Sequence, residues 1–196
     1  MRLIALYLRS RLAGRIVALL VAVATLTWLW VWWTGSSAIT LTLLPLAMPL
    51  AGAALIGAST GSPFGESEAT ASRSLGPLRI GHLTGLLVVA VVALALAVVP
   101  WNVSDGAWTL VRNLAGFTGL ALLAARVLGS GLSWAVPLGY AVLSLLAPQS
   151  GQIPAWAWSV RGATDRGAAV IATALLLAGL VLVARSGARD LGRETA

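Results

Sequence analysis

The chain has 196 residues, of which 59% are hydrophobic and only 10% are charged. Soluble domains carry about 25% charged residues, so this composition excludes an ordinary soluble protein and indicates an integral membrane protein. The thirteen basic residues are all arginine and outnumber six acids, giving a net charge of +7. Since no water-facing stretch combines basic clusters with aromatics, we expect no nucleic-acid partner. Cysteine is absent, which excludes disulfides and thiolate metal sites.

The apolar runs are continuous, which predicts membrane-spanning helices rather than the alternating strands of a β-barrel. A spanning helix needs about 20 mostly apolar residues. Six segments meet or approach this length, at residues 16–33, 38–58, 83–99, 107–128, 132–147 and 168–184. We therefore predict an all-α integral membrane protein with six transmembrane helices, forming a single domain over residues 1–196.

Arginine positions predict the orientation of this domain, because arginine-rich loops stay on the cytoplasmic side of a membrane. With six spans, ten arginines fall on one side, and only Arg112, Arg161 and Arg166 fall toward the other. Eight of the nine tryptophans then lie at the outer face, as expected for residues that favour the membrane–water interface. Five or seven spans would divide the arginines, so we expect six spans with both termini, including the tail at 185–196, in the cytoplasm.

The first 15 residues combine Arg2, Arg9 and Arg11 with leucines on one side. This pattern suits a short amphipathic helix lying on the cytoplasmic leaflet. A plain basic extension of the first span explains the same residues equally well, so both interpretations stay open. The following apolar run is long and lacks a small-residue cleavage site, so we expect it to be an uncleaved span rather than a signal peptide.

The polar island at residues 59–82 lies between two long apolar runs. Ser62 followed by Pro63 matches a helix start, and Gly76 followed by Pro77 matches a helix end. Between them the acids come early and the arginine late, as the helix dipole favours. We predict a short cytosolic helix at 63–75 that docks into a groove of a partner protein, with a solvated linker as the alternative. The candidate partner-binding residues are Pro63, Phe64, Glu66, Glu68 and Arg73.

The predicted outer loop at residues 148–167 is too long for a simple turn. It contains two prolines, Trp156, Trp158 and a charged tail that includes Arg161. A short amphipathic or re-entrant element dipping into the outer leaflet fits this composition. For Trp156 and Trp158 taken individually we favour ordinary interfacial anchoring, and we predict that both, with Arg161, are outer interfacial residues.

Arg112 is the one charge well inside an apolar segment. Because it lies near the outer end, its side chain can snorkel to the interface at low cost. The alternative is that Arg112 faces a cavity or a partner helix and pairs with Asp105. In the same segment Gly116 and Gly119, like Gly52 and Gly57 in the second span, predict close helix packing.

Enzymatic chemistry has little support in the sequence. His82 is the single histidine, and a metalloenzyme needs several ligands, so we expect no metal site. Ser133 would need a base to act as a nucleophile, and His82 is the sole candidate. No GxxxxGK[ST] loop is present, so we expect no catalytic residue and no nucleotide hydrolysis in this chain. The spans also lack a buried acid for ion coupling, which disfavours a secondary transporter.

The predicted architecture resembles that of ABC-2-type exporter permeases. The shared features are six spans, an N-terminal amphipathic helix, a cytoplasmic helix after the second span and an outer re-entrant element after the fifth. The stretches SPFGESEATASRSLGPLRIGHL (62–83) and RNLAGFTGLALLAARVLG (112–129) are also similar to small permeases of high-GC Gram-positive bacteria. The architectural similarity covers nearly the whole chain, whereas the motif similarity covers those two stretches.

The resemblance implies a permease subunit in the bacterial cytoplasmic membrane. Glu66, Glu68 and Arg73 would lie on or beside a coupling helix that docks on a separate ATP-binding subunit, and residues 148–166 would match the re-entrant region. ATP and Mg would bind to that partner, so this chain would need no cofactor. A second permease, identical or different, would complete an exporter of lipophilic or amphiphilic cargo. The rival interpretations are a membrane scaffold or regulator that binds a cytosolic partner through residues 59–82, and a membrane-embedded enzyme.

Overall fold

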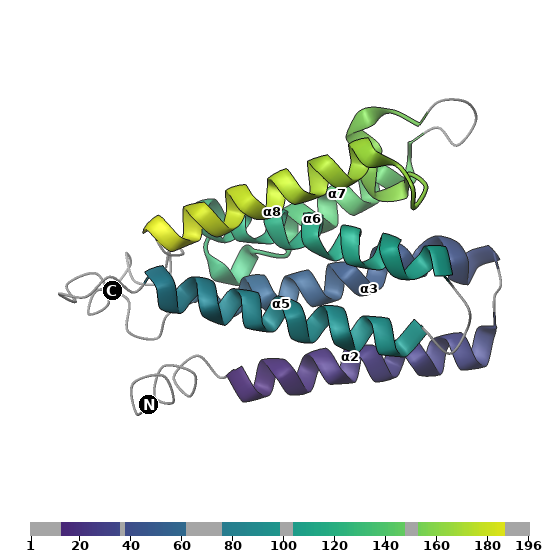
Figure 1. Cartoon of the computed structure of the whole chain (residues 1–196), viewed down its shortest axis with the longest axis horizontal. Coiled ribbons are helices and arrows are strands. Elements are labelled where there is room, and N and C mark those ends of the chain that lie inside the picture. The colour runs from purple at the N-terminus through teal and green to yellow at the C-terminus, as the bar shows by residue number, and fades with distance from the viewer. Residues whose placement is uncertain (1–12, 36–37, 62–75, 99–103, 148–152, 187–196) are drawn as a thin grey trace.

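The protein is a bundle of antiparallel helices. The computed structural model describes residues 13–35, 38–61, 76–98, 104–147 and 153–186, and every regular element in these ranges is helical. Consecutive α-helices run in opposite directions (Figure 1). The prediction of an all-helical protein is therefore confirmed. The elements are α2 (Ala13–Thr34), α3 (Ala38–Ala58), α5 (Gly76–Val98), α6 (Ser104–Leu128), η2 (Ser130–Leu132), α7 (Ala135–Leu145), η3 (Ala155–Val160) and α8 (Arg166–Ser186).

Four helices are long and apolar enough to cross a membrane, which indicates a multi-pass membrane protein. They are Gly14–Thr34, Gly76–Ala97, Ala107–Leu128 and Arg166–Arg185. Two further apolar helices are shorter, namely Leu43–Ala58 within α3 and Ser130–Leu145, which includes α7. Within the described ranges the structure thus supports four spans, and the count of six remains a prediction.

The predicted span at 132–147 differs most from the structure. Gly129 adopts a φ of 86°, a left-handed conformation that glycine reaches without steric cost, and it separates α6 from the single turn of η2. The α-helix that follows, α7, has only 11 residues. At 1.5 Å per residue it extends about 16 Å, roughly half of a hydrocarbon core about 30 Å thick.

The start of α5 corrects a second prediction. Gly76 and Pro77 begin this helix, whereas the third span was predicted to begin at residue 83; the helix predicted at 63–75 lies outside the described residues. Proline is favoured in the first turn because its missing N–H has no partner to lose there. Gly76 also lies against α8, where an added Cβ would be 3.2 Å from the carbonyl oxygen of Ala184. His82 consequently lies within α5, where its side chain is buried.

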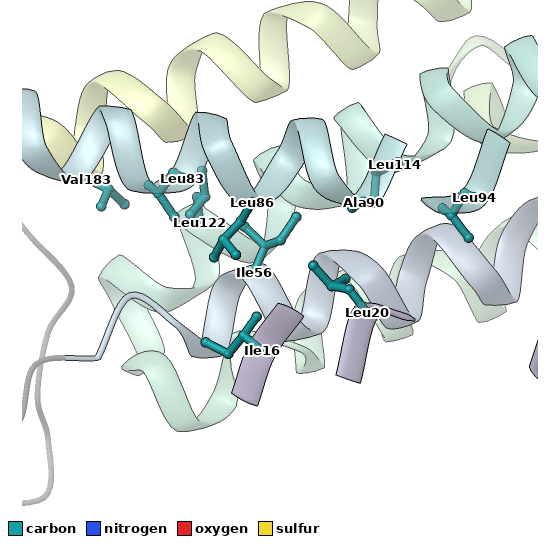
Figure 2. Close-up of a cluster of buried hydrophobic side chains, with 10 residues drawn as sticks. All are labelled: Ile16, Leu20, Ile56, Leu83, Leu86, Ala90, Leu94, Leu114, Leu122 and Val183. Atoms are coloured by element: carbon teal, nitrogen blue, oxygen red, sulfur yellow. The ribbon is translucent and has the colours of Figure 1, made fainter. Parts of the chain in front are cut away.

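The central helix is α6, which packs against α3, α5, α7 and α8. Its span is 67% buried, compared with 22% for the spans of α2 and α8. One hydrophobic cluster draws side chains from five helices (Figure 2). It consists of Ile16, Leu20, Ile56, Leu83, Leu86, Ala90, Leu94, Leu114, Leu122 and Val183. The bundle is therefore organised around α6, with α2 on its outside against α5 and α3.

Glycines allow the closest helix contacts, as the sequence predicted. An added Cβ on Gly119 of α6 would overlap the carbonyl group of Leu175 in α8, and one on Gly179 would lie 2.9 Å from the carbonyl oxygen of Gly119. A Cβ on Gly57 of α3 would lie 3.0 Å from the Cβ of Ala121. Backbones can approach this closely only where side chains are missing.

Candidate functional site

The residues before α8 are held to the bundle by polar and aromatic side chains from α6 and α7. We call residues 153–165, which contain η3, the η3 segment. It packs against α6, α7 and α8 (Figure 1). Backbone carbonyl groups in an irregular segment need donors, and this need is acute where water is scarce. Side chains of α6, of α7 and of the segment itself supply these donors.

Arg112 supplies two of these donors from inside α6. Its Nη1 donates to the carbonyl oxygen of Gly162 at 2.7 Å, and its Nη2 donates to that of Arg161 at 2.9 Å. Its Nε and Nη2 both lie 3.3 Å from Oδ1 of Asn113. With 3% of its surface exposed, Arg112 does not snorkel to the interface, so that prediction is wrong. The planar guanidinium instead points inward, because fixed carbonyl groups satisfy its donors there.

The alternative prediction for Arg112, that it faces a cavity or a partner helix and pairs with Asp105, stays a prediction. The guanidinium faces the η3 segment of its own chain. Asp105 begins the same helix, but its side chain lies outside the described part of the structure. Among the described residues, Asp165 is a carboxylate whose negative charge acts on Arg112.

Asn113 joins three elements at one point. Its Nδ2 donates to the carbonyl oxygen of Pro45 in α3 and to that of Ser159 in the η3 segment, each at 2.8 Å. Pro49 has no N–H, so the carbonyl of Pro45, four residues earlier, has no helical donor. Asn113 is fully buried and supplies the missing hydrogen bond. A proline in one helix is thus compensated by an amide in another.

Trp158 holds the η3 segment to the bundle through apolar contacts. Its ring stacks on Tyr140 with centroids 5.3 Å apart and is tilted against Phe117 at 5.6 Å. It occupies a notch at Gly116, where any Cβ would overlap the indole. Trp158 is only 2% exposed and therefore does not anchor at a lipid interface as predicted, because this aromatic notch buries it. Trp156 is 51% exposed, which is compatible with an interfacial position.

Tyr140 also has a polar role. Its hydroxyl donates to the carbonyl oxygen of Trp156 at 2.8 Å and accepts from the backbone N–H of Ser159 at 3.4 Å. Sequence reasoning identified neither Tyr140 nor Asn113. Asn113 could have been found from the pair of prolines four residues apart in the second span, since such a pair leaves a carbonyl group that needs a donor.

Asp165 and Arg161 close the η3 segment against the start of α8. Arg161 donates from Nη1 to Oδ2 of Asp165 at 2.9 Å and from Nη2 to the carbonyl oxygen of Ile153 at 2.6 Å. Asp165 Oδ1 accepts from the N–H of Ala168 at 2.9 Å, so Asp165 is the N-cap of α8. The Ala168 N–H, together with the charge of Arg161, lowers the pKa of Asp165 below its usual value.

This lowered pKa predicts an acid-sensitive cap. The carboxylate has a lower pKa in the folded state, so its stabilisation is complete above the unfolded value of about 3.9 and disappears as pH falls through the folded value. We expect Asp165→Ala to destabilise the protein by about 1 kcal/mol at pH 7. Thermal unfolding in detergent should show this difference shrinking below pH 4. A difference of the same size at pH 7 and at pH 2.5 would contradict the role of the charge, and Asp165→Asn, which keeps a capping oxygen, is the control.

The residues predicted to bind a partner, at 63–73, lie outside the described part of the structure. Ser133 is fully buried, and a Cβ added to Gly57 would lie 2.8 Å from its Oγ, so α3 covers this hydroxyl. Within the described ranges, no group of three or more His, Asp or Glu residues is placed to hold a metal ion.

Charge is distributed unevenly between the two ends of the bundle. Arg15, Arg79, Arg126 and Arg185 occupy the terminal turns of four different helices. Residues one to four positions away from them, Ile16, Leu83, Leu122 and Val183, meet in one hydrophobic cluster, so these turns lie at the same end. The η3 segment lies at the opposite end (Figure 1).

Together, the fold and these contacts define a multi-pass helical membrane protein with an arginine-rich end and a rigidly held η3 segment at the other. No family model, curated protein or solved structure matches the chain.

Proposed function

We propose that the chain is the membrane-spanning permease subunit of an ATP-driven exporter of the ABC-2 type. One observation carries the proposal. The end of α3 and the start of α5 lie at the arginine-rich end of the bundle, and residues 59–75, most of the polar island, connect them. If arginines mark the cytoplasmic side, this connection is available to a cytosolic ATP-binding subunit.

The packing offers a route for the mechanism. A partner that closes on ATP would push on the 62–75 connection and thereby on the ends of α3 and α5. Both helices pack directly on α6, which in turn contacts α7, α8 and η3. Movement of a coupling helix could thus reach the opposite end of the bundle through one central helix. A second permease would form the other wall of the pathway, and the cargo would be lipophilic or amphiphilic.

Co-purification tests this function. We expect the tagged chain, extracted from its native membrane in mild detergent, to bring along an ATP-binding cassette subunit that mass spectrometry identifies. Changing Glu66 and Glu68 to arginine should remove that subunit, because charge reversal disrupts a docked helix. The matched control reverses two acids of the C-terminal tail, Asp190 and Glu194, and should leave the complex intact.

The same experiment separates the rival functions. A retained cytosolic protein without ATPase activity would support a scaffold or regulator instead. Recovery of no nucleotide-binding protein under several mild conditions would overturn the exporter proposal. An ATPase that co-purifies and is stimulated by amphiphilic cargo in vesicles would support transport over scaffolding.

A further inference from the structure

An apolar groove runs along the outside of the bundle between α2 and α5. Its volume is about 550 Å³. Val21, Thr25 and Trp28 line one side, and Val88, Val92 and Leu96 line the other. The one hydroxyl group among these six side chains, on Thr25, already donates to the carbonyl oxygen of Val21 at 2.9 Å. The indole N–H of Trp28 is the one other polar group among these side chains, so the groove is mainly apolar and suits a hydrocarbon occupant.

The same two helix faces continue toward the arginine-rich end as an open strip of surface that contains three glycines. On α5, Gly81 and Gly85 precede Val88 and Val92 at spacings of three and four residues, which places all four on one face. On α2, Gly14 precedes the groove on the corresponding face. An added Cβ on any of these three glycines would meet no atom within 4 Å. An occupant of the groove can thus extend along the surface to the end of the bundle.

Two arginine side chains lie at the end of the bundle that this strip of surface reaches. Arg15 is exposed in the first turn of α2, and Arg79 is half-buried in the first turn of α5. The acids in the described ranges, Asp105 and Asp165, begin α6 and precede α8 at the opposite end. The undescribed segments that join this end, residues 1–12, 62–75 and 187–196, carry six arginines and four acids, so the charge of this end stays positive and is complementary to an anionic group.

The depth of the groove matches that of an acyl chain. At 1.5 Å per residue, Val21 lies about 9 Å and Trp28 about 20 Å along α2 from Arg15. One leaflet of a hydrocarbon core is about 15 Å thick. A head group at the arginines would therefore place its chain along the groove, with its terminal methyl near Thr25, which lies about 15 Å along α2 from Arg15 and about one turn before Trp28.

We propose that this groove holds an acyl chain of an anionic phospholipid whose head group contacts Arg15 and Arg79. The site does not depend on the exporter function proposed above. Head-group selectivity distinguishes it from ordinary lipid contact, because the two arginines recognise charge and the groove recognises the chain. A second copy of the chain, packing against the exposed Gly81 and Gly85, is the competing occupant.

Trp28 provides a direct reporter of occupancy. The full chain is reconstituted in phosphatidylcholine vesicles containing increasing fractions of phosphatidylglycerol with brominated chains, which quench tryptophan on contact. Subtracting the signal of Trp28→Phe isolates the quenching of Trp28. We expect half-maximal quenching at an about tenfold lower fraction of brominated phosphatidylglycerol than of brominated phosphatidylcholine. Equal fractions for the two lipids would overturn the proposal.

Charge variants test the head-group contact. The double variant Arg15→Gln and Arg79→Gln should lose the preference for phosphatidylglycerol. The matched double variant Arg126→Gln and Arg185→Gln removes two arginines from the same end but from helices that do not form the groove, so it should keep the preference. If both double variants lost the preference for phosphatidylglycerol, the preference would come from the general positive charge of this end, and the proposed head-group site would be wrong.

Groove variants test the chain contact independently of charge. Val92→Phe fills the groove and should abolish selective quenching of Trp28, whereas Val170→Phe, at an exposed position of α8, should not. Because the chain has no cysteine, Val92→Cys also introduces a unique thiol. Efficient disulfide dimers through this thiol, together with a Trp28 that brominated lipid does not quench, would assign the groove to a second copy and overturn the lipid proposal.

Discussion

Replacing Arg112 with methionine is expected to release the η3 segment while the helices stay assembled. The substitution leaves the carbonyl groups of Arg161 and Gly162 without their donors. A hydrogen bond from a charged donor contributes about 1.5–3 kcal/mol, and these two bonds are only partly buried, so local opening of the segment should become easier by about 2–4 kcal/mol. Since about 1.4 kcal/mol is a factor of ten, amide exchange in residues 153–165 should accelerate by roughly 30- to 700-fold. Hydrogen-exchange mass spectrometry in detergent measures this directly.

The global stability of the same variant should change much less. Methionine is similar in length and apolar, and it removes a buried charge whose desolvation opposes folding. Once the segment opens, its carbonyl groups can bond to water instead. We therefore expect a large local effect and a small shift in thermal unfolding. A wild-type exchange rate at 153–165 would contradict the role assigned to Arg112.

Two further variants make the test specific. Arg112→Lys keeps the charge but replaces the forked donor geometry with a single ammonium group, so its effect should be intermediate. Arg126→Met removes an arginine from the far end of the same helix and should leave exchange at 153–165 unchanged.

The helix positions were largely predictable, because bilayer thickness imposes long apolar runs. The predicted segment 38–58 coincides with α3, and 107–128 coincides with the candidate span in α6. The predicted helix boundaries were wrong where a contact with a distant part of the chain determines where a helix begins or ends. Gly76 and Pro77 can end one helix or begin another, and here Gly76 packs on Ala184, far along the chain. The run at 132–147 is apolar throughout, so hydropathy alone could not show that α7 has only 11 residues.

The arrangement at the η3 segment was less predictable. Arg112 was identified as unusual, but its partners are backbone carbonyl groups, which leave no pattern in a sequence. Trp158 follows a composition typical of interfacial anchors, yet the notch at Gly116 and the ring of Tyr140 bury it. The general preference of tryptophan for the membrane interface was therefore outweighed, for Trp158, by a notch in the bundle that fits its indole ring.

Replacing Gly119 with alanine is expected to force α6 and α8 apart. The new Cβ would overlap the carbonyl group of Leu175, whose oxygen would lie 2.5 Å away. Neither this backbone nor that of α6 can rotate aside as a flexible side chain would. Overpacking of this kind costs about 1–3 kcal/mol, and unfolding in a denaturing-detergent titration should show the loss. Gly139→Ala in α7 is the matched control, because its Cβ would meet nothing within 4 Å, and we expect it to stabilise the protein by about 0.5–1 kcal/mol.

A double variant shows whether one contact is responsible. Gly179 of α8 lies against the carbonyl oxygen of Gly119, so Gly179→Ala should also separate the two helices. Once either alanine has moved them apart, the other meets less resistance, and the double variant should lose clearly less stability than the two single losses added together. Additive losses would mean that the two glycines act separately. Equal effects of Gly119→Ala and Gly139→Ala on stability would show that helix propensity alone, rather than the backbone contact, determines the result at both positions.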